Sequence, residues 1–334
     1  MTLVIVIVLI TIALGFEYIN GFHDTANAVA TSISTKALTP LQAIVIAALF
    51  NLIGAFLSTN VAVTIGKGLV DPHAVSGTVI AAALFAAIIW NLITWYLGIP
   101  SSSSHALMGG LVGAVWAYSS IHSVFFIGLI KKVILPMLFS PIIAFFLAFI
   151  IMIICSRIFY NTRRARKVNN NIREVQVIST ALMAASHGSN DAQKSMAIIT
   201  LTLMSYGYID NVAVPAWVIL ICAICMAAGT LSGGMRIIKT LSSRVAQLKP
   251  VSGVSAELSS AILIFTASFL GFPLSTTQAV SGSIMGAGST GKKSINWGVA
   301  KSMVIGWGLT IPICMVVGAV IVFFINWVHH ITIS

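Results

Sequence analysis

The chain has 334 residues, of which 58% are hydrophobic and 7% are charged, and its mean hydropathy is +1.03. Soluble domains carry about 25% charged residues, so this composition excludes an ordinary soluble protein. The formal net charge of +11 would suit a nucleic-acid partner in a soluble protein, but most Lys and Arg here fall in short loops, where they set membrane topology. We therefore expect an all-α polytopic membrane protein that binds no nucleic acid.

The first half of the chain begins with an apolar stretch from about Thr2 to Ser34, which is too long for one span. We expect a helix that is broken at the polar motif Gly21-Phe-His-Asp24. A second span follows over roughly 41–65. Residues 74–118 then form two apolar arms around the turn Gly98-Ile-Pro-Ser-Ser-Ser-Ser-His105. This pattern predicts a re-entrant helical hairpin with the serines at its tip.

A short amphipathic piece and a further span occupy residues 121–154, and a strongly basic segment follows at 157–173. This basic segment divides the chain in two. We therefore predict a first repeat over residues 1–156, a basic cytoplasmic linker over 157–173 and a second repeat over 174–334.

The second half repeats the first. It contains a predicted broken helix around Asn190-Asp191, a span over about 212–234, an arm over 254–270 and a tip at Gly271-Phe-Pro-Leu-Ser-Thr-Thr-Gln278. The two tips match at Gly98/Gly271, Pro100/Pro273, Ser102/Ser275, Ser103/Thr276, Ser104/Thr277, His105/Gln278, Gly109/Gly282 and Gly113/Gly286. Two motif pairs recur in the same order about half the chain length apart, so we interpret the chain as an internal duplication.

The orientation of the repeats follows from the hairpins. If each hairpin enters and leaves on one side, each half crosses the membrane an odd number of times, and the halves have opposite topology. With the N-terminus outside, most of the basic residues fall inside, as the positive-inside rule requires: Lys36, residues 157–173, residues 236–249, Lys292, Lys293 and Lys301. Inverted repeats with broken helices and a midplane site are the architecture of many secondary transporters.

An ionisable cluster, Ser186-His-Gly-Ser-Asn-Asp-Ala-Gln-Lys194, lies inside a long apolar segment. A charged side chain at the bilayer centre costs at least about 2.5 kcal/mol, so Asp191 and Lys194 predict a binding or transport site. The earlier motif His23-Asp24-x-x-Asn27 aligns with Asn190-Asp191-x-x-Lys194. Each motif therefore contributes a carboxylate and a candidate partner to the same site.

Hydroxyl residues at the two tips suit a tetrahedral oxyanion. Helix N-termini offer unpaired N–H groups and a partial positive charge, and Ser and Thr hydroxyls add donors. These candidate substrate ligands are Ser102, Ser103, Ser104, Ser275, Thr276 and Thr277. Ordinary helix caps are the alternative, and the duplication argues against it.

The carboxylates Asp24 and Asp191 must be neutralised before a dianion can bind beside them. Sodium ions or protons can do this, with Asn27 and Asn190 as donors to substrate or as cation ligands. The ammonium of Lys194 could occupy the place of a bound cation. We also include His23, His187, Glu17 and Glu257 as candidates for proton or cation coupling, because they are ionisable groups expected within the membrane.

With these motifs the chain resembles the inorganic phosphate transporter (PiT) family, whose signature is a Gly-x-Asn-Asp-x-x-Asn-like phrase near the start of each half. The resemblance covers nearly the whole chain, and its form His-Gly-x-Asn-Asp-x-Gln-Lys is similar to the low-affinity bacterial Pit branch. It implies a transport domain, a scaffold domain and a lipid-surrounded homodimer in a bacterial plasma membrane. It also implies phosphate contacts at Asp24, Asn27, Asp191 and both tips.

The resemblance also implies the reaction, which is phosphate import by a secondary transporter that is not an enzyme and holds no cofactor or metal of its own. Proton symport is the expected coupling, with a metal–phosphate complex as an alternative form of the cargo. His23 and Lys194 stand where sodium-coupled members tend to have Asn, so fewer oxygen ligands remain for sodium. The alternatives are a sodium-coupled phosphate symporter and a sulfate permease of the same fold.

Overall fold

The computed structural model describes residues 2–71, 74–159, 165–290 and 295–333. The described residues form helices joined by short loops, and their β-structure is limited to two isolated bridges. The predicted all-α class is therefore confirmed. Four of the basic residues expected on the inner side of the membrane lie outside the described residues: Arg163, Arg164, Lys292 and Lys293.

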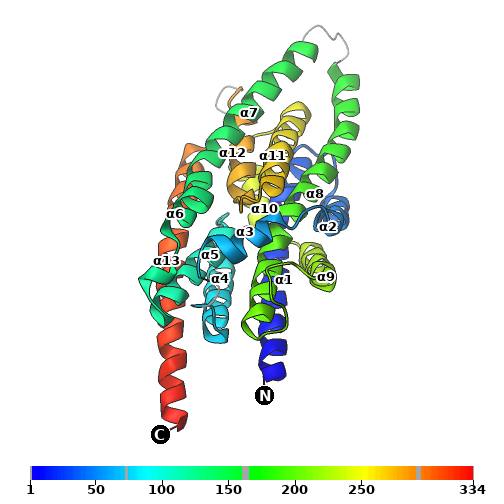
Figure 1. The fold of residues 1–334 in the computed structure, drawn as a ribbon. Coiled ribbons are helices and arrows are strands. Elements are labelled where there is room, and N and C mark those ends of the chain that lie inside the picture. The colour runs from blue at the N-terminus through cyan, green and yellow to red at the C-terminus, as the bar shows by residue number, and fades with distance from the viewer. Residues whose placement is uncertain (1, 72–73, 160–164, 291–294, 334) are drawn as a thin grey trace.

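Two long helices form the centre of the molecule (Figure 1). Helix α1 spans Thr2–Ser34 and helix α8 spans Ala165–Ser205. Both run without interruption through the polar motifs, so the breaks predicted at Gly21–Asp24 and at Asn190–Asp191 are wrong. The reason is that the motif side chains are buried against partners on neighbouring helices, so the helical backbone does not need to open to satisfy them.

Helix breaks occur instead in the segments that follow these two helices. The predicted span over 41–65 is divided into α2 (Pro40–Gly54) and α3 (Asn60–Gly68). In the second half, α9 (Ala216–Ser232) is followed by α10 (Met235–Lys239), with a bend of 61° between them and Gly233 at φ +66°. A π-helical turn at Thr240–Arg244 continues from α10.

The two hairpins have the predicted construction. Helices α4 (Gly77–Leu97) and α5 (Ser103–Tyr118) form the first hairpin, and α11 (Pro250–Leu270) and α12 (Thr276–Gly288) form the second. Each first arm ends at a glycine in the left-handed region, where L side chains are strained: φ is +68° at Gly98 and +76° at Gly271.

Each second arm starts at a serine cap. The hydroxyl of Ser102 accepts a hydrogen bond from the N–H of His105 at 3.2 Å, and that of Ser275 accepts one from the N–H of Gln278 at 3.3 Å. These bonds satisfy one free donor at each helix start. The two caps therefore use the same position of the duplicated tip.

The remaining chain forms two long outer helices. A short 3-10 turn (Ile121–Ser123), α6 (Phe126–Leu129) and a π-helical turn (Ile130–Ile134) lead into α7 (Leu135–Phe159), and α13 spans Trp297–Ile333. Among the described residues, five helical stretches are long and apolar enough to cross a membrane: Thr2–Ser34, Gly77–Leu97, Phe126–Ile158, Pro250–Leu270 and Trp297–Val328.

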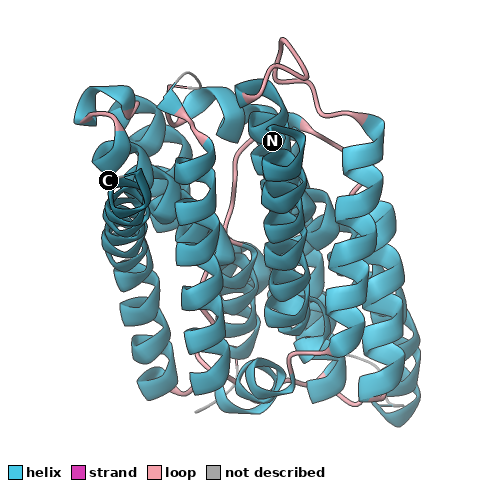
Figure 2. Ribbon diagram, turned by 90° about the horizontal axis from the view of Figure 1, so that it is seen from below, coloured by secondary structure: helices cyan, strands magenta, loops and turns pink. Residues whose placement is uncertain are grey.

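Corresponding helices of the two halves run in opposite directions. In Figure 1, α1 and α7 rise while α8 and α13 descend, and both chain ends lie at the bottom. Seen from below, the helices form one bundle with both ends toward the viewer (Figure 2). The division into inverted repeats across a membrane, with the boundaries 1–156, 157–173 and 174–334, stays a prediction.

Glycines lie where helices of the two halves pack closely on each other. A Cβ on Gly21 of α1 would lie 2.5 Å from the carbonyl oxygen of Met226 on α9, and one on Gly188 of α8 would lie 2.2 Å from that of Asn51 on α2. In the same way, Gly113 of α5 meets α13, and Gly286 of α12 meets α7. The hairpin arms and the central helices therefore pack closely on elements of the opposite half.

Candidate functional site

One face of α1 carries a buried polar stripe. Glu17, Asn20, Asp24, Asn27 and Thr31 are separated alternately by three and four residues, which places them on one side of a helix. All five are buried. Two helical turns separate Glu17 from Asp24 and Asp24 from Thr31, about 10 Å along the axis in each case. The stripe therefore has a central layer at Asp24 and one flanking layer on each side.

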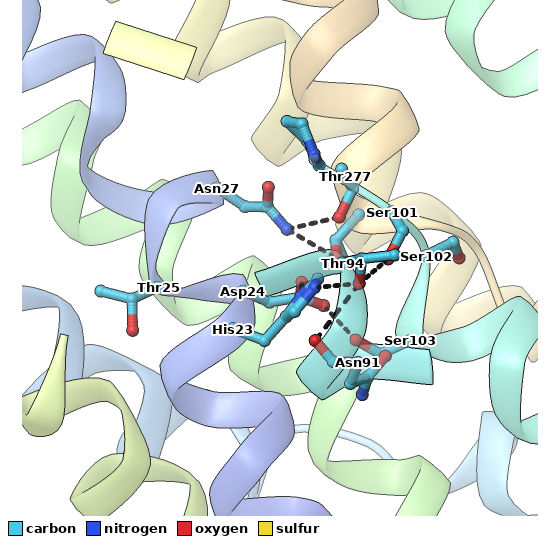
Figure 3. Close-up of polar contacts among 12 residues, drawn as sticks. His23, Asp24, Thr25, Asn27, Asn91, Thr94, Ser101, Ser102, Ser103 and Thr277 are labelled. Carbon is cyan, nitrogen blue, oxygen red and sulfur yellow. Dashed lines mark hydrogen bonds and ion pairs between the residues drawn. The ribbon is translucent and has the colours of Figure 1, made fainter. Parts of the chain in front are cut away.

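Asp24 binds both a histidine and the first tip. Nδ1 of His23 lies 2.6 Å from Oδ1 of Asp24, and the Ser103 hydroxyl donates to Oδ2 at 3.0 Å (Figure 3). Nε2 of His23 lies 3.1 Å from the hydroxyl oxygen of Thr94 on α4. The first hairpin therefore fixes the carboxylate through one direct bond and one bond relayed by His23.

Asn27 reaches the second tip. Its amide nitrogen donates to the hydroxyl oxygen of Thr277 at 2.9 Å (Figure 3). It also donates to the hydroxyl oxygen of Thr276 at 3.3 Å. The Thr276 hydroxyl in turn donates to Oδ2 of Asp191 at 3.3 Å. Ser103 and Thr276 occupy the same position in the two tips, so each half contributes one hydroxyl bonded to the aspartate of its own motif.

Asp191 has a cationic partner within its own helix. Nζ of Lys194 lies 2.9 Å from Oδ2 of Asp191, and Nε2 of His187 lies 3.4 Å from the same oxygen. Nδ1 of His187 lies 3.2 Å from the amide oxygen of Asn51 on α2. The two aspartates thus differ, because Asp191 has a fixed ammonium within ion-pair distance and Asp24 has His23.

The two halves meet at this point. Ligand atoms of Asp24, His187 and Asp191 all lie within 4.8 Å of one another, and all three residues are buried. Three oxygens beside them, Oδ1 of Asn27, Oδ1 of Asn190 and Oδ1 of Asp191, have no hydrogen-bond partner among the described residues. The arrangement combines hydroxyl, amide and ammonium donors with two carboxylate acceptors. Such a set can bind a protonated oxyanion, which both accepts and donates hydrogen bonds.

Some predicted site residues have other partners. The Ser102 and Ser275 side chains cap their helices, the Ser104 hydroxyl donates to the carbonyl of Leu274 at 3.2 Å, and the Asn190 amide donates to that of Phe272 at 3.3 Å. These groups hold the tips and α8 together. Ser103, Thr276 and Thr277 are the tip hydroxyls that contact the motif side chains.

The two predicted glutamates lie outside the central layer. Glu257 on α11 accepts hydrogen bonds from four side chains, Thr31, Gln176, Ser179 and Thr180. Glu17 on α1 accepts one, from the Ser195 hydroxyl at 2.5 Å. The structure therefore places one buried acid in each flanking layer.

Sequence reasoning missed three contributors. Thr94 contacts His23, Asn51 contacts His187, and Oε1 of Gln193 accepts from the N–H groups of Val61 and Ala62 at 2.8 and 3.1 Å. Asn51 is a single polar residue inside an apolar run, and Thr94 shares such a run with Asn91. These polar residues in apolar surroundings were the available signal. Gln193 lies inside the motif but serves the start of α3.

Comparison with known proteins gives consistent matches. The model of the phosphate transporter family matches residues 20–318. The chain is 47% identical to a "probable low-affinity inorganic phosphate transporter" of Bacillus subtilis over 98% of both chains. It is 43% identical to a protein of the same description from Rhizobium meliloti, over 94% of this chain and 95% of the other.

A solved structure described as "the sodium-dependent phosphate transporter" shares the fold. Its TM-score is 0.90 with 22% identity, and the match covers 97% of this chain and 99% of that one. The family match spans most of the chain, and the relatives match almost from end to end. With its long apolar helices, the protein is a multi-pass transporter of the bacterial plasma membrane and not an enzyme. The chain belongs to the phosphate transporter family.

Proposed function

We propose that this protein imports inorganic phosphate by proton symport, with the anion bound between Asp24, Asp191 and the two hydroxyl tips. The proposal of proton coupling rests on the ion pair between Lys194 and Asp191, whose Nζ and Oδ2 atoms lie 2.9 Å apart. A lysine ammonium supplies a fixed positive charge at the carboxylate, where a sodium-coupled site would need a mobile cation. It also removes oxygen ligands, because an ammonium can only donate.

Phosphate suits the donors and acceptors of the central layer. The hydroxyls of Ser103 and Thr276 now donate to the aspartates, and each can rotate to donate to a phosphate oxygen. A phosphate that retains a proton can then donate to the carboxylate that lost its hydroxyl partner. Each such donation replaces a hydroxyl bond that a carboxylate oxygen loses, and so offsets part of the desolvation cost of binding.

Sulfate is the rival tetrahedral dianion. At neutral pH sulfate has no proton to donate. Its oxygens would lie beside the carboxylate oxygens of Asp24 and Asp191, and no hydrogen bond can form because all of these oxygens are acceptors. The two buried carboxylates, whose ligand atoms lie within 4.8 Å of each other, therefore favour phosphate.

A neutral metal–phosphate complex is the second candidate cargo, and one observation favours it. Asp24, His187 and Asp191 offer three ligand atoms close enough to share one divalent ion. An ion carried with phosphate would offset the two carboxylates in the same way as protons do. This form differs from free phosphate in requiring a divalent cation in the outer medium.

The homodimer implied by the resemblance remains part of the proposal. Apolar side chains exposed along α7 and α13, such as Phe146 and Phe323, suit either lipid or a second copy. Cross-linking in native membranes would separate a stable dimer from a monomer surrounded by lipid.

Uptake of labelled phosphate into proteoliposomes tests the proposal. We expect an inward proton gradient in sodium-free buffer to stimulate uptake, excess sulfate to leave it unchanged, and Asp191→Asn to abolish it. Uptake that requires Na⁺ would assign sodium coupling, and competition by sulfate would assign a sulfate permease. Parallel samples with a chelator or with added Mg²⁺ decide between phosphate and its metal complex.

A further inference from the structure

Glu17 is a buried acid with few partners. Its side chain is 0% exposed, Ser195 donates to Oε2, and Oε1 has no hydrogen-bond partner among the described residues. Glu257, the other buried glutamate, accepts four hydrogen bonds, which is what a structural carboxylate requires. Glu17 therefore lacks the partners that would hold an ionised carboxylate in an apolar interior.

Asn20 extends the polar path from Glu17 toward the phosphate site. It follows Glu17 by one turn and precedes Asp24 by one turn on the same face of α1. It is fully buried, and both atoms of its amide lack partners among the described residues. On α8, Ser195 directly follows Lys194. One buried side chain with unused polar atoms, Asn20, thus lies between Glu17 and the central layer, and Oε1 of Glu17 is unused as well. These buried polar atoms require a ligand or a proton that the described side chains do not supply.

The side chains here suit a proton better than a metal ion. Hard cations require about six oxygen ligands, whereas the side chains here offer the carboxylate, the Ser195 hydroxyl and one amide oxygen. The charged and titratable groups that interact electrostatically with Glu17 are Lys194 and Asp191 on α8, Asp24 on α1, and Cys222 and Cys225 on α9. Among these, Lys194 is the positive charge, and it also pairs with Asp191.

We propose that Glu17 binds the proton that travels with phosphate and that Lys194 links its protonation to anion binding. The inference rests on the proposed proton symport. A proton from water forms an O–H bond with the Glu17 carboxylate on one side of the membrane, and that bond breaks on the other side when the proton returns to water. While Glu17 is ionised it competes with the anion for the ammonium of Lys194; once it is neutral, the ammonium is available to phosphate.

Glu17→Gln fixes the neutral state and provides the test. We expect proton-gradient-driven uptake to fall about tenfold or more, while phosphate–phosphate exchange across the proteoliposome membrane continues, because exchange requires no net proton movement. Phosphate affinity should fall by about tenfold from pH 6 to pH 8 in the native protein and should fall less steeply in Glu17→Gln, where the titration of phosphate itself remains. Thr11→Val on the exposed side of α1 is the matched control and should behave as the native protein.

Two results would overturn the assignment. One is gradient-driven uptake by Glu17→Gln equal to that of the native protein, and the other is loss of exchange by a Glu17→Gln protein that elutes from size exclusion as the native protein does. If Glu17→Gln does not fold, Glu17→Asp and Ser195→Ala test the role of Glu17 instead. Both variants should keep phosphate uptake but shift its pH profile. An unshifted pH profile contradicts the proposal. A native protein that ignores the proton gradient refutes the proposed symport itself, before any variant is compared.

Discussion

The ammonium of Lys194 lies 2.9 Å from Oδ2 of Asp191, one turn earlier on α8, and both side chains are buried. The pair places a fixed positive charge in the second motif at the position aligned with Asn27 in the first. This asymmetry between the two otherwise similar motifs has consequences for both stability and coupling.

Lys194→Met should destabilise the protein by about 3–5 kcal/mol, because Asp191 would remain as a buried charge without its ammonium. The double variant Lys194→Met with Asp191→Leu should recover part of this loss, since no unpaired charge is left. Thermal unfolding in detergent measures both. A single variant that is no less stable than the double variant would show that an unpaired Asp191 carboxylate does not destabilise the fold.

Lys194→Asn should make transport responsive to sodium. The amide restores an oxygen ligand and removes the resident charge, so that a mobile cation can compensate Asp191. We expect phosphate uptake by this variant to be weak in choline buffer and to rise when Na⁺ is added. Equal uptake in both buffers would argue that the position of Lys194 does not select the coupling ion.

Ser102→Ala and Ser103→Ala should differ in their effect on transport. Ser102 caps α5, and removal of a cap costs about 1 kcal/mol of stability with little effect on phosphate KM. Ser103 donates to Asp24, and its loss should raise the KM about tenfold and also cost about 1–3 kcal/mol of stability, because a buried carboxylate oxygen loses its donor. Measuring KM and the unfolding temperature for both variants checks the assignment, which fails if the two have the same profile.

Gly21→Ala should destabilise the protein by about 1–3 kcal/mol, because the added methyl group would lie 2.5 Å from the Met226 carbonyl oxygen. Gly15→Ala on the same helix is the control, since a Cβ there has no atom within 4 Å, and it should change stability by at most about 1 kcal/mol. The comparison of their unfolding temperatures also tests whether Gly21 serves packing rather than a helix break.

The sequence predicted the elements whose signals are local. The left-handed glycines Gly98 and Gly271 and the serine caps after them are local backbone requirements, so their pattern was sufficient to identify both hairpins. The helix breaks were misplaced because polar residues in an apolar run can be satisfied either by an unwound backbone or by partners on other helices. The sequence does not distinguish these, and the partners of Asp24 and Asp191 lie far away along the chain.

The sequence indicated the residues of the candidate site but not their arrangement. The cost of placing a charge in an apolar run marked Asp24, Asp191 and Lys194 from the sequence alone, since the position of each residue in such a run is local information. Only the tertiary structure separated Ser103 from the capping Ser102, brought Thr94 and Asn51 to the histidines, and gave Glu257 four donors but Glu17 only one. These outcomes depend on which helices pack together, and contacts between distant segments are set by the whole fold.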